Sequence, residues 1–330
     1  ADLTRPPVRG RLVRGAALPL LDGGSDVVAG QVLPDRHRLA SEPSDSVQVV
    51  RDKERRLERL SAPDGPIANW SRAADAWCAA ALWPGPAPSH AIVTEWIASV
   101  LGGHTTLPAG QLRQWLTKAA GVAAGHAVFH WELAFPEVFF DDAGRRRGDG
   151  GFDAVLGHPP WDMLRADSGG ARARGADRER AAPLRRFFRS SGIYTAQGHG
   201  HANRYQLFLE RTLALTKPNG RFGLILPSGL ATDHGSAHLR RRLLDGCAVD
   251  TWIGLDNKAG IFPIHRSMRF ILLAATTSGR TDVLKFRSGL QDPAVLDGYA
   301  SDPRQDRASD CLSVSRSRLE AWDPERLSVP

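Results

Sequence analysis

Apolar residues recur at helical spacing through the first part of the chain. In residues 69–83, 90–101 and 111–122 they return every three or four positions, and Gly102-Gly103 ends the second of these segments. This period predicts three amphipathic helices, whose tryptophans we interpret as packing residues between helices. The charged run at 51–60 predicts a further helix that is largely solvated.

The pattern changes in the second half of the chain. Short apolar runs that are typical of buried strands alternate there with amphipathic segments that are typical of helices. Strands are predicted at residues 152–156, 222–226, 249–254, 270–275 and 282–286, and helices at 205–216 and 238–244. The turn Lys217-Pro218-Asn219-Gly220 closes the first of these helices. Alternating strands and helices predict an α/β sheet, in which ligands bind at the carboxyl ends of strands.

A chain of 330 residues has room for about two domains. Residues 1–50 are rich in Gly, Pro and Asp without a sustained period, which predicts an irregular segment. Residues 51–125 form the helical segment and 126–290 the sheet region, and 291–330 remain as a tail.

Charge and cysteine content narrow the possible partners. A formal charge of +7 and a pI near 9.8 favour a polyanion, chiefly nucleic acid. Cys78, Cys247 and Cys311 show no paired spacing, which argues against disulfides and a zinc site. No apolar run approaches the roughly 20 residues that span a bilayer. With no signal peptide at the start, we expect a cytoplasmic protein without a membrane partner.

Arginines are concentrated between residues 165 and 189, separated by small residues. The segment is either a solvated insertion or a surface that contacts the phosphate backbone of DNA. In the second case the candidate DNA-binding residues are Arg172, Arg174, Arg178, Arg185 and Arg186.

The strongest candidate chemistry lies in His158-Pro159-Pro160-Trp161, directly after a predicted strand. Proline fixes its backbone dihedral and lacks an amide donor, so the segment is rigid and leaves carbonyl oxygens free to accept. The neighbouring aromatic ring offers a flat surface for a base. Together they suit the exocyclic amine of a nucleobase that has left the duplex.

Two stretches of sequence resemble the large adenine-specific amino-methyltransferases of bacterial type IIG restriction–modification and phage-exclusion systems. They are residues 129–139 (FHWELAFPEVF) and 151–161 (GFDAVLGHPPW). The resemblance continues in order through 203–211, 217–227, 238–240, 261–262 and 266–270, and covers about half the chain.

The resemblance implies a fold, a cofactor and partners. The fold is the carboxyl-terminal half of a Rossmann-like class I methyltransferase sheet, preceded by a mainly helical segment. Residues 126–290 become the catalytic region, and 291–330 a linker or the start of a DNA-recognition region. The methyl donor is S-adenosylmethionine, the substrate is double-stranded DNA, and a restriction or defence-system subunit is a further partner.

Carried over by position, the resemblance assigns a catalytic role to each residue from His158 to Trp161. His158 stands where the family has Asn or Asp and accepts a hydrogen bond from the adenine amine. The Pro159 carbonyl is the second acceptor, and Trp161 stacks on the flipped base. Imidazole differs from an amide because it offers one acceptor when neutral and none when protonated.

The family's cofactor loop has no clear counterpart, and Asp22-Gly23-Gly24 is the nearest segment to it. Cofactor-binding residues therefore stay unassigned, and we expect a fragment that lacks this loop. No metal site is predicted, because His199, His201 and His234 stand in a Gly-rich setting with no convergent carboxylate.

Three alternatives remain open. A catalytically inactive methyltransferase-like fragment would bind DNA or a partner subunit. Methylation of the cytosine amine uses the same segment, usually with Ser in the first position. A protein, RNA or small-molecule methyltransferase would use the same sheet.

Overall fold

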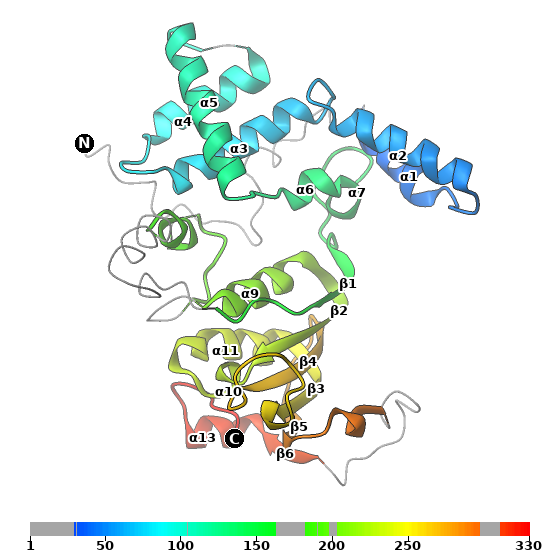
Figure 1. Cartoon of the computed structure of the whole chain (residues 1–330), viewed down its shortest axis with the longest axis vertical. Helices are drawn as coiled ribbons and strands as arrows, with labels where there is room; N and C mark the ends of the chain where they lie inside the picture. Colours follow the sequence, from blue (N-terminus) through cyan, green and yellow to red (C-terminus); the bar gives the residue numbers. More distant parts are fainter. Residues whose placement is uncertain are drawn as a thin grey trace. The chain divides into compact units, whose positions relative to one another are not determined.

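The computed structural model describes residues 30, 32–103, 105–162, 182–189, 191–197, 203–297 and 311–330. The chain divides into two compact units, which Figure 1 shows coloured along the sequence. Unit 1 comprises Ala1–Gly150 and Ala166–Ile193, and unit 2 comprises Gly151–Arg165 and Tyr194–Pro330. Within the described ranges, no helix has the length and apolar character needed to cross a membrane.

Unit 1 is mainly helical in its described part (Figure 1). Its helices are α1 (Leu33–Ser41), α2 (Val47–Ser61), α3 (Ala68–Leu82), α4 (His90–Gly102), α5 (Ala109–Gly125), α6 (Trp131–Ala134) and α7 (Pro136–Phe139). Residues 182–189 are helical as well. The expected helical segment before the sheet is confirmed.

The core of unit 1 is built on three tryptophans, Trp83 directly after α3, Trp96 of α4 and Trp115 of α5. The ring centroids of Trp83 and Trp96 lie 5.5 Å apart, and those of Trp96 and Trp115 lie 5.0 Å apart. Ser89 caps α4 by accepting a hydrogen bond from the Ile92 amide. The interpretation of these tryptophans as packing residues is confirmed.

The structure differs from the irregular segment expected up to residue 50. A helix, α1, forms where Pro34 occupies the first turn, a position that tolerates a missing amide donor. Helix α2 begins four residues earlier than the charged run, because Ser46 accepts a hydrogen bond from the Val49 amide at 3.2 Å. Of the two helices, only α2 has a side-chain cap that the sequence could signal, Ser46.

Unit 2 contains the sheet. Its strands are β1 (Phe152–Gly157), β2 (Thr216–Pro227), β3 (Cys247–Asp256), β4 (Arg269–Thr277), β5 (Val283–Leu290) and β6 (Leu312–Ser315). Its helices are α9 (Arg204–Leu215), α10 (Gly229–Thr232), α11 (Ala237–Gly246) and α13 (Arg316–Trp322), with 3-10 turns at His234–Ser236, Asn257–Ala259 and Pro293–Leu296.

The six strands form one mixed sheet in the order β1-β2-β4-β3-β5-β6. Strands β1 and β2 are parallel and joined through α9, whereas β4 runs antiparallel to both β2 and β3. Phe222, Leu224 and Leu226 of β2 pack into one core with residues of α9 and α11, which lie beside the sheet in Figure 1. The α/β sheet predicted from the sequence is confirmed.

The predicted turn at 217–220 lies within the range of β2 but outside its regular pairing. Phe152 pairs with Thr216 and Ala154 with Arg221, so β2 holds three more residues than β1 between these pairs. Asn219 has φ of 60°, the left-handed conformation that Asn tolerates. The turn residues therefore bulge out of the strand.

Strand β1 has a strand neighbour on one side only among the described residues. Leu156 lies opposite Gly223 and is 90% exposed. An apolar side chain so exposed is unusual in a strand with a parallel partner, since such strands are normally covered.

Residues 311–330, where a linker or the start of a DNA-recognition region is expected, belong to unit 2. Strand β6 pairs with β5, Arg316 of α13 forms an ion pair with Asp245 at 2.8 Å, and the Val329 amide donates to the Ala231 carbonyl at 3.0 Å.

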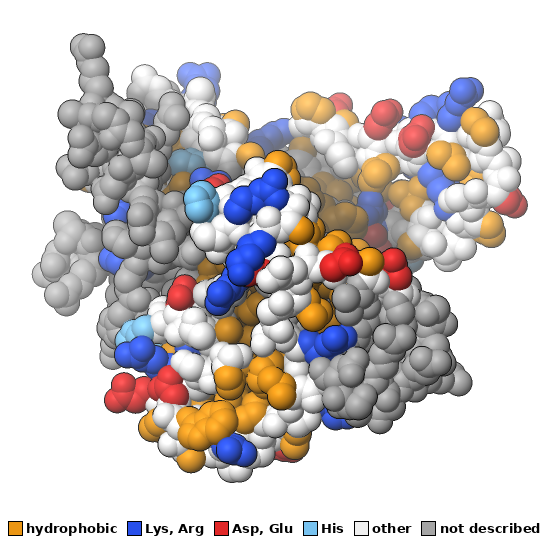
Figure 2. Space-filling view, turned by 60° about the horizontal axis from the view of Figure 1, so that its bottom comes forward, with side chains coloured by type: hydrophobic (Ala, Val, Ile, Leu, Met, Phe, Trp, Pro, Cys, Tyr) orange, Lys and Arg blue, Asp and Glu red, His pale blue; other side chains and the backbone are white. Residues whose placement is uncertain are grey.

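Figure 2 shows hydrophobic side chains gathered at the lower end of the face toward the viewer. The large exposed apolar residues of β5, β6 and α13 are Val283, Leu312 and Trp322.

A buried carboxylate fixes the segment that precedes α9. Glu210 is 1% exposed and accepts hydrogen bonds from the Ala196 amide at 2.8 Å and from Gln197 Nε2 at 2.7 Å. Arg242 of α11 pairs with it at 3.1 Å. A carboxylate with this many donors offsets the free energy lost on leaving water.

Replacing this carboxylate should destabilise the protein. We expect Glu210→Gln to lower the free energy of unfolding by about 2 kcal/mol, because an amide loses the ion pair and presents a donor to other donors. Urea unfolding measures the change. Glu325→Gln, at an exposed position, is the control and should change stability by less than about 0.5 kcal/mol. Equal effects of the two substitutions would contradict the role of Glu210.

The described cysteines differ in reactivity. All three are free, with Cys78 and Cys247 buried and Cys311 partly exposed. Burial raises the pKa of the Cys247 thiol to about 11. At pH 8, only about one thiol in a thousand would then be ionised. Iodoacetamide should therefore label Cys311 before Cys247, as mapped by mass spectrometry, and faster labelling of Cys247 would show that this core is open.

Candidate active site

The parallel pairing of β1 with β2 places His158–Trp161. Gly157 lies opposite Leu224, so the segment leaves β1 beside the carboxyl-terminal end of β2. Pro159 is buried, whereas His158 and Pro160 are exposed. The Arg204 amide donates to the Asp162 carbonyl at 3.1 Å, which fastens the end of this segment to the start of α9.

Four rings converge at this end of the sheet. The His158 ring centroid lies 5.1 Å from that of Trp161 and 5.0 Å from that of Phe262. The Trp161 and Phe262 centroids are 6.0 Å apart, with the rings edge to face at 84°. Phe270 of β4 packs against Trp161 at 5.9 Å and against Phe262 at 5.0 Å. These separations are typical of attractive aromatic pairs.

Trp161 is anchored as well as packed. Its indole Nε1 donates to the Ile225 carbonyl of β2 at 3.3 Å, and the ring packs against both apolar cores of unit 2. The donor is thereby satisfied and the ring orientation fixed. Trp161 is therefore a fixed wall of the site.

His158 lies on the exposed side of this cluster. Among the described residues, its imidazole contacts the rings of Trp161 and Phe262 and has no hydrogen-bond partner. A neutral imidazole in this position has one ring nitrogen available to accept from a ligand.

Phe262 is the residue of this site that the sequence left unassigned. It belongs to the loop between β3 and β4, about 100 residues after His158. Its only sequence signal was a place in the family resemblance. Nothing in the local pattern of apolar residues distinguishes it from a packing position.

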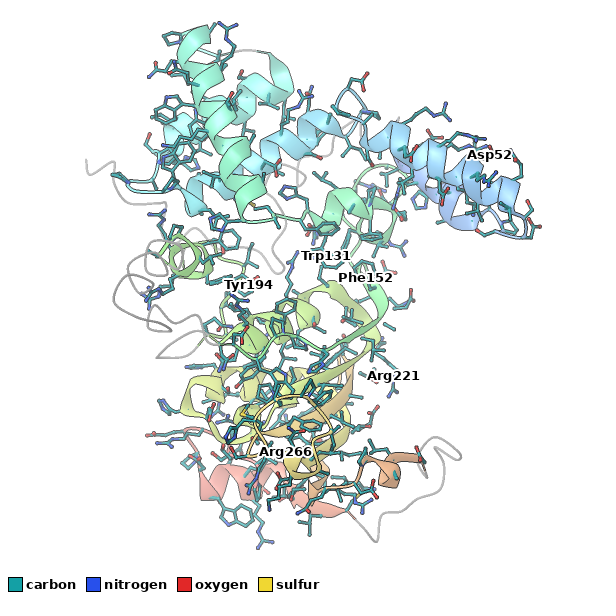
Figure 3. All side chains as sticks on the ribbon, in the orientation of Figure 1. Asp52, Trp131, Phe152, Tyr194, Arg221 and Arg266 are labelled. Atoms are coloured by element: carbon teal, nitrogen blue, oxygen red, sulfur yellow. The ribbon has the colours of Figure 1, made fainter. Side chains whose placement is uncertain are left out.

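The loop that carries Phe262 is held from within. Asn257 is fully buried. Its side chain accepts a hydrogen bond from the Phe262 amide and donates to the Phe262 carbonyl and to two further carbonyls. Arg266, labelled in Figure 3, donates from Nη1 to the Lys258 carbonyl at 2.9 Å. The loop is thus held in one conformation by its own hydrogen bonds, at the edge of the ring cluster.

The arginine-rich segment falls only partly in the described residues. Arg172, Arg174 and Arg178 lie outside them, whereas Arg185 and Arg186 lie in the helical residues 182–189. Arg186 donates to the carbonyls of Ala81, Trp83 and Gly85 at the end of α3. A cation at the carboxyl terminus of a helix is favourable, so Arg186 has a structural role in unit 1.

The sequence motif at 129–139 is structural in unit 1. Arg36 of α1 forms a bidentate pair with Glu137, with distances of 2.8 and 2.7 Å, and also donates to the Ala134 carbonyl. Phe139 is buried, and Trp131 stacks on Phe135 with centroids 6.1 Å apart.

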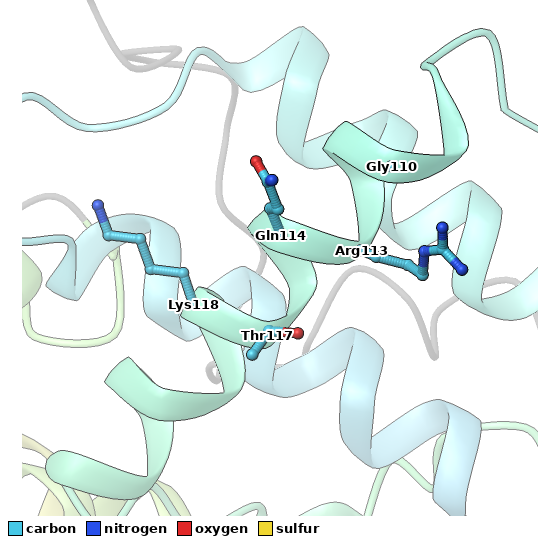
Figure 4. Close-up of a pocket in the computed structure, with 5 residues that line it drawn as sticks. All are labelled: Gly110, Arg113, Gln114, Thr117 and Lys118. Atoms are coloured by element: carbon cyan, nitrogen blue, oxygen red, sulfur yellow. The ribbon is translucent and has the colours of Figure 1, made fainter.

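Other candidate sites carry little chemistry. Figure 4 shows a shallow depression on α5, lined by Gly110, Arg113, Gln114, Thr117 and Lys118. Within the described ranges, no three His, Cys, Asp or Glu side chains converge as metal ligands would. His199 and His201 lie outside those ranges, as do Asp22, Gly23 and Gly24.

The matched part of the chain contains this site. Residues 105–262 match the family model described as Eco57I restriction-modification methylase. The match includes His158–Trp161 and ends at Phe262. The restriction–modification methylase family predicted from the sequence is confirmed for this segment.

Solved structures give more distant similarities. A modification subunit of a putative type I restriction enzyme from Vibrio vulnificus YJ016 is 14% identical, with a TM-score of 0.38, over 84% of this chain. The type I restriction enzyme EcoKI M protein is 11% identical with a TM-score of 0.37, over 92% of this chain and 83% of its own. The chain spans 63% of the length of the Vibrio subunit. A comparison with curated proteins gave no match.

The stability of residues 105–262, here called the methylase segment, should depend on Trp161. We expect Trp161→Ala to lower the free energy of unfolding by about 3 kcal/mol, through lost packing on Phe262 and Phe270 and the unpaired Ile225 carbonyl. Urea unfolding measures it. Trp322→Ala is the control, because Trp322 is 56% exposed and should change stability by less than about 1 kcal/mol. A smaller loss at Trp161 than at Trp322 would show that the ring cluster is loose.

Proposed function

We propose that the methylase segment holds the target base of an adenine-specific DNA methyltransferase, in a restriction–modification or phage-defence system. The reaction is methylation of the exocyclic amine of an adenine that has been flipped out of double-stranded DNA. The observation that carries the proposal is the convergence of His158, Trp161 and Phe262 beside Pro159, at the carboxyl-terminal end of a parallel strand.

Each residue has a role that its chemistry supports. The Pro159 carbonyl and the His158 imidazole accept the two hydrogens of the amine. Trp161 and Phe262 bring aromatic surfaces to the base, and stacking on such a surface contributes about 1–3 kcal/mol. Pro160 keeps the segment rigid, so the acceptors are in place before the base arrives.

The rings must rearrange to admit a base. A base between two parallel rings needs about 7 Å between them, twice the usual contact distance. Trp161 and Phe262 are 6.0 Å apart and edge to face. Because Trp161 is anchored on β2, we propose that the Phe262 and His158 side chains rotate.

S-adenosylmethionine, which the family implies, would supply the methyl group. The described residues do not by themselves fit this cofactor. His158 is exposed, and β1 has no strand neighbour on its other side among the described residues. They hold the substrate side of the site, and the assignment of cofactor-binding residues stays open.

The partners remain part of the proposal. Double-stranded DNA and a restriction or defence-system subunit are inferred from the family, and Arg172, Arg174, Arg178 and Arg185 from charge alone. Arg186 contributes less to DNA binding in this proposal, because its donors are engaged by α3. The choice of adenine over cytosine rests on the sequence resemblance, and a cytoplasmic location goes with it.

One observation favours a second function. His158 occupies the place of the family's Asn or Asp, and an imidazole presents its acceptor at a different reach from an amide oxygen. The second candidate is therefore an inactive methyltransferase-like protein that binds DNA or a partner subunit.

Substitution of His158 separates the two functions. If His158 accepts from the amine, His158→Ala should lower kcat by about 100-fold or more, and His158→Asn should retain or raise it. The measurement is transfer from labelled S-adenosylmethionine to unmethylated genomic DNA, with N6-methyladenine and N4-methylcytosine identified by mass spectrometry. RNA and protein substrates run in parallel test the remaining alternatives.

The outcomes differ for each candidate. Transfer by the native protein excludes the inactive function. Transfer by His158→Asn alone supports it, because the fold would then retain a site that only His158 disables. Methylation of cytosine, RNA or protein in place of adenine would overturn the proposed substrate.

A further inference from the structure

Asn257 is the one fully buried asparagine among the described residues, and it lies in the loop of the ring cluster. We infer that Asn257 is a positioning residue, which fixes the main chain of Phe262 so that the Phe262 ring meets the target base in one orientation. The inference rests on the proposed function, since the ring has a base to meet only there.

The hydrogen bonds of Asn257 converge on Phe262. Its Oδ1 accepts from the Phe262 amide at 2.9 Å, and its Nδ2 donates to the Phe262 carbonyl at 3.1 Å. Nδ2 also lies 3.3 Å from the carbonyls of Ile264 and His265. One side chain thus holds Phe262 on both sides of its Cα atom.

Both ends of the loop are fixed independently. The Asn257 amide donates to the Met268 carbonyl at 3.0 Å, which closes the loop where β4 begins. Gly260 has φ of 77°, a left-handed conformation that favours glycine, and the Arg266 guanidinium lies next to it. The turn at Gly260 and the hydrogen bond from Arg266 to the Lys258 carbonyl fix the first part of the loop. With its ends closed, the loop has little freedom except at the centre, where Asn257 acts.

The chemistry requires an amide side chain. It supplies one acceptor for the Phe262 amide and two hydrogens for the carbonyls. An ionised aspartate would keep the acceptor but repel the carbonyls, and alanine would leave the Phe262 amide without the acceptor that Asn257 gives it. Because Asn257 fixes the main chain of Phe262, the movement that admits a base is limited to rotation about the side-chain bonds of Phe262, and it starts from one position of the Cα atom.

The consequence for catalysis is specific. A displaced Phe262 would let the base turn away from Pro159 and His158, so fewer bound bases would reach the reacting orientation. DNA binding through the phosphate backbone would be largely unaffected. Asn257 should therefore act on kcat more than on KM.

The test is a double-mutant cycle on the full chain. Asn257→Ala and Phe262→Ala are compared with the double variant, in methyl transfer to unmethylated genomic DNA. We expect each single substitution to lower kcat by about 10-fold or more with KM for DNA changed less than about 2-fold, and the double variant to match Phe262→Ala. Asn257→Asp should give an intermediate kcat.

Asn69→Ala, at an exposed position of α3, is the matched control and should leave kcat and KM unchanged. If the Asn257 and Phe262 effects multiply in the double variant, Asn257 supports the fold without acting through Phe262, and the inference is overturned. If Asn257→Ala does not fold cooperatively on heating, the same cycle is made with Asn257→Asp.

A structural readout keeps this inference separate from the proposed function. With 5-fluorotryptophan incorporated, the fluorine signal of Trp161 reports on the adjacent Phe262 ring, and Trp161→Phe assigns it. We expect Asn257→Ala to shift this signal in the same direction as Phe262→Ala, and Asn69→Ala to leave it in place. An unchanged signal overturns the inference. A shifted signal without any methyl transfer by the parent leaves the positioning intact and refutes the proposed function alone.

Discussion

The parallel pairing of β1 with β2 is the constraint on which the site depends. Parallel strands end at the same edge of a sheet, so the segment after β1 must leave beside the end of β2. Trp161 then reaches the Ile225 carbonyl, and β4, paired with β2, brings Phe270 beneath the indole. Without this register, His158–Trp161 would be an exposed loop with nothing to fix its rings.

The spacing of apolar residues predicted most of the fold, because a helix or strand that is buried on one face has apolar residues at regular intervals in its sequence. The helices near the tryptophans and strands β1 to β5 were recognised within a few residues. Helix α1 and strand β6 were missed for a physical reason. Each is short, and each is held by tertiary partners, Glu137 for Arg36 of α1 and β5 for β6, which no local pattern reveals.

The site was predictable only as far as it is local in sequence. His158, Pro159 and Trp161 are neighbours along the chain, so the chemistry of a rigid segment with acceptors and an aromatic ring was visible at once. Phe262 reaches the same place through the hairpin of β3 and β4, and its register depends on the whole sheet. The role of Asn257 was harder still to predict, since an asparagine in a loop is usually exposed and its burial here depends on the folded loop around it.

Two buried polar residues show how loops near the sheet become rigid. Glu210 accepts hydrogen bonds from main-chain amides before α9. Asn257 forms hydrogen bonds with the Phe262 amide and with carbonyls of the loop after β3. In each case the main-chain groups of a loop find in one side chain the partners that a helix or strand would give them. A loop whose main-chain groups are paired in this way is held in one conformation, because any other conformation leaves buried polar groups unpaired. The main chain of such a loop is therefore fixed by hydrogen bonds, and Phe262 stands on one of these loops.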